Sequence, residues 1–504
     1  MKTSLLLLVI FAGATAARAD VKLPAIFSDH MVLQADMAVP VWGWAEPGEE
    51  VTVSFATQSK TTKADTDGKW KVKLDKLKVG EAPQTLTVIG KNALAVKDVL
   101  VGEVWLGSGQ SNMALNVGAV KNATDEIAAA NFPALRMFTV RSSAAATAQE
   151  DCPGLWQVCS PVTVPLFSAT AYFFGRDLHR TLGVPVGLIN SSVGGTRIES
   201  WISTEAQQQT PEVKAAADAL TKAARAYNPA VAKAAFEKSL AKWQEVAAQA
   251  KAEGKEPPRA PSDPVAIRQK IGEVGGLFNG KIAPLIPYAL RGVVWYQGEA
   301  NSSPDRAAFY GHQLPALIAD WRARWGSEFP FAWVQLPNFD GGAIRDWPLM
   351  REQMLKTLKV KNTGMAIAID VGEANNIHPK NKQEVGHRLA LWALGTVYGQ
   401  KVPSISGPLP VGYEVRGSAV VLKFDHADGG LVAKDGELKG FVIAGEDKKW
   451  VSARAKIEGG EVIVSSSDVS KPAAVRYAWE NNPVCNLYNG AGLPASPFRT
   501  DDWK

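Results

Sequence analysis

Residues 104–113 read VWLGSGQSNM, an apolar run followed by two glycines and a serine. The apolar run predicts a buried strand, and the glycines allow the backbone to turn sharply after it. Many hydrolases hold a serine hydroxyl at the carboxyl end of a sheet strand in this way. The spacing differs from the G-x-S-x-G elbow because Met113 occupies the last position. Alone, the stretch fits a nucleophile and an ordinary loop serine equally well.

The sequence around this stretch, from residue 104 to residue 403, alternates between strand-like and helix-like segments. Apolar runs predict further strands at 186–190, 293–296, 331–336 and 365–369. Amphipathic segments between them predict helices, which gives βα units and a mainly parallel sheet. In such sheets ligands bind beyond the carboxyl ends of the strands. We therefore expect an α/β catalytic domain over 104–403.

Two segments flank this domain and one interrupts it. Residues 20–103 and 404–504 contain short alternating runs separated by turn signals, which predicts β-rich regions of sandwich or jelly-roll type. An Ala- and Lys-rich stretch at about 206–274 breaks the βα alternation, and Thr210-Pro211 is a good helix start. We expect a helical insertion there, either simply solvated or acting as a lid over the site.

The chain begins like an exported protein. Residues 1–19 contain Lys2, an apolar run at 5–11 and the triplet Ala17-Arg18-Ala19. This pattern predicts a signal peptide cleaved after Ala19 and a periplasmic or secreted product. No other stretch reaches the roughly 20 apolar residues of a membrane helix, so we expect no membrane insertion.

Composition points to a globular protein without a strongly charged partner. Apolar residues make up 46% of the chain, and the formal charge of +5 falls to +3 when residues 1–19 are removed. That balance favours neither nucleic acid nor an anionic membrane as a partner. The three cysteines form no zinc-ligand spacing, and we expect no metal and no cofactor. We expect a Cys152–Cys159 disulfide, with Cys485 buried and free.

The loops after the predicted strands hold the candidate chemistry. They begin at Ser111, Gly194, Gln297 and Asn375. If the strands are parallel, all four loops open on one edge of the sheet. A serine nucleophile needs a base, and a positioned imidazole can accept its proton. Of the six histidines, only His378 stands in a loop after a strand of the middle region, so we choose it as the base.

Attack on an ester carbonyl also needs donors for the oxyanion, each typically worth ~3 kcal/mol of barrier. The natural donors here are the backbone N–H groups of Ser111 and Gly195 and the side-chain amide of Gln297. A tight turn at Gly194-Gly195 and a sheet-end hydrogen bond from Gln297 are the structural alternatives.

Several segments resemble the sialate O-acetylesterases and related bacterial carbohydrate acetylesterases, within the SGNH (GDSL-type) hydrolases. They spread over nearly the whole chain beyond residue 19 and read FSDHMVLQ (27–34), VWGW (41–44), GQSNM (109–113), GGT (194–196), WYQGE (295–299), IHPK (377–380) and NLYN (486–489). The resemblance implies a flavodoxin-like catalytic domain and a metal-free serine esterase that removes acetyl groups from sugars. It also implies that Ser111 is the nucleophile, His378 the base, and Gly195 and Gln297 oxyanion-hole members.

The chain departs from this family at the third member of the triad. SGNH enzymes commonly carry an aspartate three residues before the histidine, or two before it in similar acetylesterases, where this chain has Asn375 and Asn376. An asparagine cannot stabilise an imidazolium with a negative charge. We predict a serine–histidine pair oriented by a backbone carbonyl or an asparagine, with Glu373 as a helper. Asp370 and Glu299 are the other nearby carboxylates.

Further candidates for support or substrate contact are Asn112, Glu299 and Arg197; for Arg197 with Glu199 a structural salt bridge is the alternative. The expected partner is an acetylated oligo- or polysaccharide, either a sialoglycan or a plant cell-wall polysaccharide such as xyloglucan or xylan. A glycan-binding protein without activity and a lipid esterase or thioesterase of the same superfamily remain competing interpretations. The oligomeric state stays open.

Overall fold

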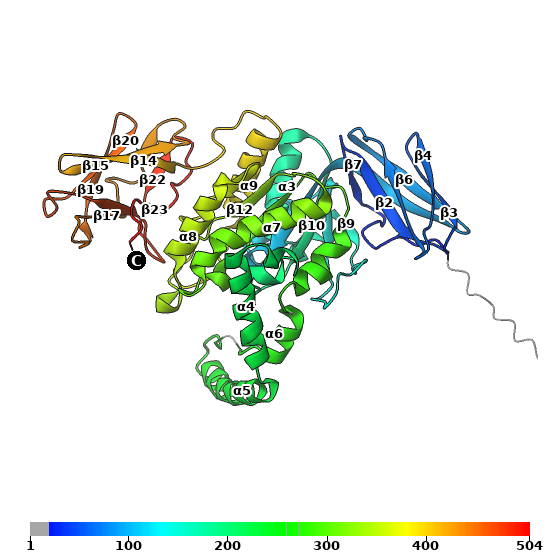
Figure 1. Cartoon of the computed structure of the whole chain (residues 1–504), viewed down its shortest axis with the longest axis horizontal. Coiled ribbons are helices and arrows are strands. Elements are labelled where there is room, and N and C mark those ends of the chain that lie inside the picture. The colour runs from blue at the N-terminus through cyan, green and yellow to red at the C-terminus, as the bar shows by residue number, and fades with distance from the viewer. Residues whose placement is uncertain (1–19, 259, 272, 504) are drawn as a thin grey trace, which may run out of the picture.

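The computed structural model describes residues 20–258, 260–271 and 273–503. Strands of the N-terminal part lie at one end of the molecule and strands of the C-terminal part at the other, with an α/β region between them (Figure 1). Helices α4 (Pro211–Ala226), α5 (Pro229–Ala252) and α6 (Pro264–Ile271) project from this middle region. The expected signal peptide at 1–19 lies outside the described residues.

A large mixed sheet runs through the molecule, and its central strands are parallel in the order β13-β12-β11-β7-β10-β8. The antiparallel strand β9 pairs with β8 at the edge. Their bounds are β7 Ala93–Gly109, β8 Phe132–Thr139, β9 Trp156–Cys159, β10 Val186–Ser192, β11 Gly292–Tyr296, β12 Phe331–Val334 and β13 Thr363–Ala366. The central strands are buried apolar runs, as expected where helices cover both faces of a sheet. The α/β class is thus confirmed, with antiparallel strands in the same sheet.

Strand β7 belongs to two parts of this sheet. Its first half pairs antiparallel with β6 (Gly80–Ile89), and residues 100–102 pair with β1 (Val32–Gln34). From residue 103 onward it pairs with β10 and β11. The domain boundary expected between residues 103 and 104 therefore falls inside one continuous strand.

The N-terminal strands alternate buried and exposed side chains. β2 (Val39–Trp44) pairs with β5 (Lys69–Leu74), and β3 (Glu50–Phe55) pairs with β4 (Gln58–Lys63) and β6. In β5 the three lysines are exposed while the apolar residues between them are buried. Period-two burial places one face of each such strand against the core.

Helices on the central sheet pack closely. α3 (Ala169–Leu182) begins at Ser168, whose hydroxyl accepts a hydrogen bond from the Ala171 N–H, and ends at Gly183 with φ 64°. It packs against α9 (Lys382–Trp392), where a Cβ on Gly386 would come within 2.5 Å of the Phe173 side chain. The remaining long helices of this region are α7 (Tyr310–Trp325) and α8 (Trp347–Lys356).

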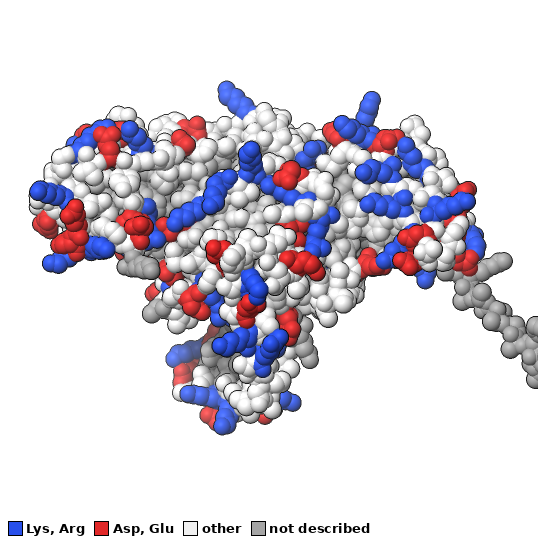
Figure 2. All heavy atoms as spheres, viewed as in Figure 1, with Lys and Arg blue, Asp and Glu red and all other residues white. Residues whose placement is uncertain are grey.

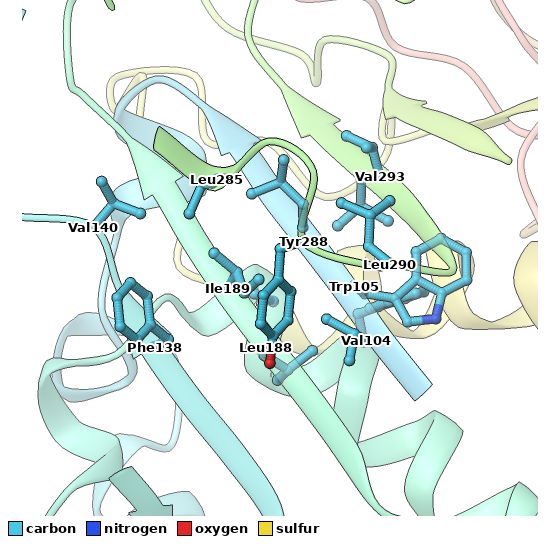
Figure 3. Close-up of a cluster of buried hydrophobic side chains, with 14 of the residues drawn as sticks. Val104, Trp105, Phe138, Val140, Leu188, Ile189, Leu285, Tyr288, Leu290 and Val293 are labelled. Atoms are coloured by element: carbon cyan, nitrogen blue, oxygen red, sulfur yellow. The ribbon is translucent and has the colours of Figure 1, made fainter. Parts of the chain in front are cut away.

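One part of the core lies between the sheet strands and the segment that precedes β11. Figure 3 shows side chains of β7, β8, β10 and β11 meeting Leu285, Tyr288 and Leu290. Trp105 is fully buried among them. The hydroxyl of Tyr288, also buried, donates a hydrogen bond to the Val32 carbonyl at 2.7 Å, so this buried polar group is paired.

Among the projecting helices, α4 packs against α7 of the middle region. α4 buries Val213, Ala216 and Ala217, whereas α5 has no buried residue. On the face seen in Figure 2, lysines and arginines are interspersed with acidic residues, on these helices as elsewhere. No helix of the described residues is long and apolar enough to cross a membrane.

The C-terminal part consists of short strands in separate small sheets. Their bounds are β14 Leu409–Arg416, β15 Ala419–Asp425, β16 Leu431–Ala433, β17 Phe441–Ala444, β18 Val451–Ser452, β19 Arg454–Glu458, β20 Glu461–Ser465, β21 Ala474–Tyr477, β22 Leu487–Asn489 and β23 Phe498–Arg499. A second buried apolar cluster holds them together.

The expected Cys152–Cys159 disulfide is wrong, because all three cysteines are free. Cys159 ends β9, where its Sγ lies 3.8 Å from the Ala130 carbonyl. Burial raises the pKa of the Cys152 and Cys159 thiols to about 12, which keeps them protonated. Cys485 is free as expected, but it is partly exposed rather than buried.

Candidate active site

Ser111 opens the short helix α1 (Ser111–Ala114) at the carboxyl end of β7. The turn before it depends on Gly109, which has φ 134° and passes so close to β11 that a Cβ would lie 2.2 Å from the Tyr296 carbonyl oxygen. The Gln110 N–H donates to that same carbonyl at 2.9 Å. A side chain at position 109 would therefore displace the strand end that carries the serine.

His378 lies in the loop between β13 and α9, and the structure brings it to Ser111. Its Nε2 is 2.8 Å from the serine Oγ, a distance at which the hydroxyl can donate its proton to the ring. Three other histidines bond elsewhere: His30 to Asp98, His179 to the Val184 carbonyl and His387 to Asp177.

Asn376 and Glu373 hold the backbone of the histidine loop. The Asn376 side chain accepts a hydrogen bond from the His378 N–H at 3.0 Å and donates one to the His378 carbonyl at 2.9 Å. It also donates to one oxygen of Glu373, whose other oxygen accepts the Lys380 N–H at 2.7 Å. Burial works to raise the pKa of Glu373, but these two hydrogen bonds lower it overall. The contacts of Glu373 thus order the loop around the base.

The other candidates near the histidine have different surroundings. Asp370 pairs with Arg388 at 2.6 Å and accepts a hydrogen bond from the Tyr488 hydroxyl at 3.1 Å. Asn375 is exposed at the surface of the loop. Asp370 is therefore held by the contact between α9 and the C-terminal strands.

Gly194 and Gly195 follow β10 beside the serine. A Cβ on Gly194 would lie 3.3 Å from the Ser111 Cβ, so a larger residue would crowd the nucleophile. Gly195 is exposed, with φ 76° and open space around its Cα. Within the described residues, neither its backbone N–H nor that of Ser111 donates a hydrogen bond. Both donors are available to an oxyanion.

Gln297 is fully buried after β11 and is bonded on every side. Its Nε2 lies within hydrogen-bond distance of Asn301 Oδ1 (2.8 Å), the Thr196 carbonyl (3.0 Å) and Gln110 Oε1 (3.2 Å). Its Oε1 accepts the Tyr310 hydroxyl at 2.9 Å. Three acceptors compete for two amide hydrogens, so the amide must exchange one of them to reach an oxyanion.

A buried polar network formed by Asn112, Glu299 and Lys382 lies behind the serine and the histidine. Asn112 Nδ2 is 2.5 Å from Glu299 Oε1, and Lys382 Nζ donates to Asn112 Oδ1 at 2.8 Å. The exposed fraction of the three residues is 0%, 1% and 0%. The second carboxylate oxygen of Glu299 has no hydrogen-bond partner among the described residues.

The two ionisable members of this network are shifted in opposite directions by the same cause. Burial lowers the pKa of Lys382 to about 7, against the attraction of the Glu299 and Glu373 carboxylates. Burial also raises the pKa of Glu299, against the hydrogen bond from Asn112. Desolvation disfavours the charged form of each group.

A cavity of about 340 Å³ lies between the loop that follows β10 and the projecting helices. Gly195, Arg197 and Ser200 form one wall, and residues of α4 and α6 together with Tyr227 form the other. The Arg268 guanidinium lies 4.5 Å above the Tyr227 ring, and its Nη2 donates to the Ala224 carbonyl.

Arg197 contributes a cation to this cavity. Burial lowers its pKa, and so does the positive charge of Arg306. In the described ranges, no carboxylate lies within ion-pair distance of its guanidinium. Glu199, the alternative salt-bridge partner, instead accepts a hydrogen bond from Asn301 at 2.9 Å. The structural ion pair between Arg197 and Glu199 is therefore not formed.

Sequence reasoning missed Lys382 and the internal bonding of Gln297. Lys382 stands one turn after Pro379 at the start of a predicted helix, where a lysine is normally solvated. No period or motif distinguishes it from exposed Lys380 beside it. The described residues contain no group of three or more His, Cys, Asp or Glu side chains arranged to hold a metal ion.

Comparison with known proteins gives concordant matches. The family model of carbohydrate esterases described as sialic acid-specific acetylesterases matches residues 101–234 and 280–394. The chain is 32% identical to the sialate O-acetylesterase of Rattus norvegicus, covering 98% of this chain and 97% of that one. It is 31% identical to the human sialate O-acetylesterase, with coverage of 94% and 91%.

Among solved structures, a carbohydrate acetylesterase from Xanthomonas citri superposes with a TM-score of 0.81 at 36% identity. The match covers 96% of this chain and 100% of the other. These matches extend over almost the full length of the chain. The chain therefore belongs to the sialate O-acetylesterase family of carbohydrate esterases and is a carboxylic ester hydrolase.

Proposed function

We propose that this protein is an exported carbohydrate O-acetylesterase that works through an acetyl-serine intermediate on Ser111. The observation that carries the proposal is the 2.8 Å contact between Ser111 Oγ and His378 Nε2, at the carboxyl edge of a parallel sheet. The fold around it is taken to be of the SGNH hydrolase type, with the N- and C-terminal strands as flanking sandwich-like regions. The pattern of residues 1–19 supports export.

The first half of the reaction transfers the acetyl group to the enzyme. Ser111 Oγ attacks the ester carbonyl carbon while its proton passes to Nε2 of His378. The backbone N–H groups of Ser111 and Gly195 stabilise the oxyanion of the tetrahedral intermediate, and Gln297 adds its amide. The intermediate collapses when the bond to the sugar oxygen breaks, and that oxygen takes the proton from His378.

The second half releases acetate. A water molecule attacks the carbonyl carbon of the acetyl-serine and gives a proton to His378. The Ser111 Oγ then leaves, recovers this proton, and acetate dissociates. In this scheme Glu373 and Asn376 act on the backbone of the loop that carries His378, and Asn376 stands at the position of the triad acid in similar acetylesterases.

The cavity beside Gly195 is the proposed place for the sugar. It begins next to the oxyanion donors, and its volume of about 340 Å³ suits one or two sugar rings better than a long chain. Arg197 supplies hydrogen-bond donors for hydroxyl or carboxylate oxygens of the glycan. The relatives are named for sialate esters, and acetylated plant polysaccharides such as xyloglucan or xylan are the second substrate class to test.

The decisive experiment is an acetate-release screen across acetylated sialoglycans and acetylated plant polysaccharides. The wild-type enzyme should release acetate from one class, and the Ser111→Ala variant should lose about 10⁴-fold in kcat/KM or more. A fluorophosphonate should label Ser111 in the wild type only. Retention of a glycan without acetate release or labelling would instead identify a binding protein, and preference for longer acyl groups would identify a lipid esterase or thioesterase.

A further inference from the structure

The residues before and after His378 both have carbonyl groups that accept hydrogen bonds from buried side chains of one network. The Ile377 carbonyl accepts from Asn112 Nδ2 at 3.0 Å, and the Pro379 carbonyl accepts from Lys382 Nζ at 2.6 Å. We propose that Asn112, Glu299 and Lys382 are positioning residues, which fix His378 against Ser111 through the backbone on both sides of the imidazole. The proposal rests on the proposed function, because it assigns these residues a part in that reaction.

The geometry of the loop explains how such contacts orient a ring. Peptide groups on either side of His378 set the direction of its Cα–Cβ bond, and Pro379 already fixes one backbone angle. With the Ile377 and Pro379 carbonyls bonded to the network, and the His378 N–H and carbonyl bonded to Asn376, the peptide groups around the base have defined partners. The imidazole then keeps its direction without rearrangement during the reaction.

The same network reaches the nucleophile. Asn112 is the residue after Ser111, and its own carbonyl accepts a hydrogen bond from Thr170 Oγ1 at 3.2 Å on α3. Asn112 is thus joined to Ser111 by a peptide bond and to the histidine loop by a hydrogen bond from its side chain. A displacement of Asn112 would change the separation of the two reacting groups directly.

Lys382 and Glu299 are needed together because each is buried. The Asn112 amide stands between them, donating to the carboxylate and accepting from the ammonium. The ammonium also lies 5.4 Å from the centre of the Tyr296 ring. Removing one charge would leave the other buried without compensation, which is costly to stability. A test must therefore separate loss of folding from loss of positioning.

The first test compares Lys382→Met with Lys380→Met, a matched control because Lys380 is exposed on the same loop. With 4-nitrophenyl acetate, kcat of the Lys382 variant should fall about 100-fold while KM changes little, since misplacement of a reacting group by about 1 Å has such an effect. The rate of fluorophosphonate labelling of Ser111 should fall by the same factor. The control should match the wild type in both measurements.

The second test adds Glu299→Gln to Lys382→Met. Removing both charges should return the free energy of unfolding toward the wild-type value, while kcat stays low because the Pro379 carbonyl still lacks its donor. A folded Lys382 variant with wild-type kcat, or a double variant that regains kcat, would overturn the positioning role. If Ser111→Ala were as active as the wild type, the proposed function itself would fail, which is a different result.

Discussion

The two regions next to Ser111 differ in burial and in hydrogen bonding. On one side Asn112, Glu299 and Lys382 are fully buried and bonded to one another. On the other side, exposed Gly195 and half-buried Arg197 border a cavity walled by projecting helices. The first arrangement resists movement because burial makes each broken hydrogen bond expensive. The second leaves donors unpaired until a ligand arrives.

The family model includes the buried side and also the part of the cavity wall formed by Gly195, Arg197 and α4. The family model covers the strands that carry Ser111, Gln297 and His378, but it leaves out residues 235–279, which hold most of α5 and all of α6. In the proposed function, the reaction belongs to the buried side and the choice of sugar to the open side. Substitutions on the buried side should lower kcat, and those on the open side should raise KM.

The largest effect is expected where the two sides meet, at the base. His378→Ala should lower kcat/KM for 4-nitrophenyl acetate by about 10⁴-fold, because the serine hydroxyl loses its proton acceptor. Stopped-flow or steady-state assays at pH 7.5, with circular dichroism as the check on folding, measure this. A loss of less than about tenfold would assign the base to another residue.

A smaller loss is expected from Gln297→Ala. Removing one oxyanion donor typically lowers kcat by about 10²–10³-fold. Tyr310, Thr196 and Asn301 would also lose their partner, so the melting temperature should fall as well. If the melting temperature falls and kcat does not, then Gln297 serves the fold alone and the oxyanion relies on the two backbone donors.

The pH dependence of stability tests the buried side without any substrate. The pKa of Lys382 in the folded protein, about 7, lies below its usual value of 10.5. The unfolded chain therefore binds more protons between these pH values, and this group makes the free energy of unfolding rise with pH, by up to about 1.4 kcal/mol per pH unit. Urea unfolding at pH 7.5 and pH 9.5 should show a smaller rise in Lys382→Met. Equal slopes would mean that Lys382 does not titrate in this range.

The smallest effect belongs to the open side. Arg197→Gln should raise KM for the acetylated glycan by about tenfold, the value of one hydrogen bond to a charged group, while kcat with 4-nitrophenyl acetate stays the same. Arg225→Gln on exposed α4 surface is the control. A fall in kcat with the aryl ester would place Arg197 in the reaction. The expectation that the open side affects only KM would then be wrong.

Much of the middle region could be predicted because its signals are local. Buried parallel strands read as apolar runs, and the strands expected at 186–190 and 293–296 appear as β10 and β11. Ser111, Gly195, Gln297 and His378 could be chosen as candidates because parallel strands deliver their following loops to one edge. The contact between Ser111 and His378 follows from that topology.

Contacts that depend on packing could not be predicted. Lys382 is buried against Asn112 and Tyr296, which are distant from it in sequence, and the sequence near it is indistinguishable from that of an exposed helix start. The expected disulfide is wrong for a related reason. A separation of seven residues does not determine the distance between the two cysteines, and Cys159 is placed by strand β9. Arg197 and Glu199 are close in sequence, yet Glu199 accepts a hydrogen bond from Asn301 instead of pairing with Arg197.

Strand β7 has a consequence for how this enzyme could be divided or recombined. Because the residues that pair with β1 and β6 and the residues that end at Ser111 belong to one strand, a cut near residue 103 would expose a sheet edge in both fragments. The N-terminal strands are then no detachable module that can be exchanged between enzymes. They should unfold in one cooperative transition with the catalytic region, and a truncated enzyme should aggregate rather than work at reduced rate.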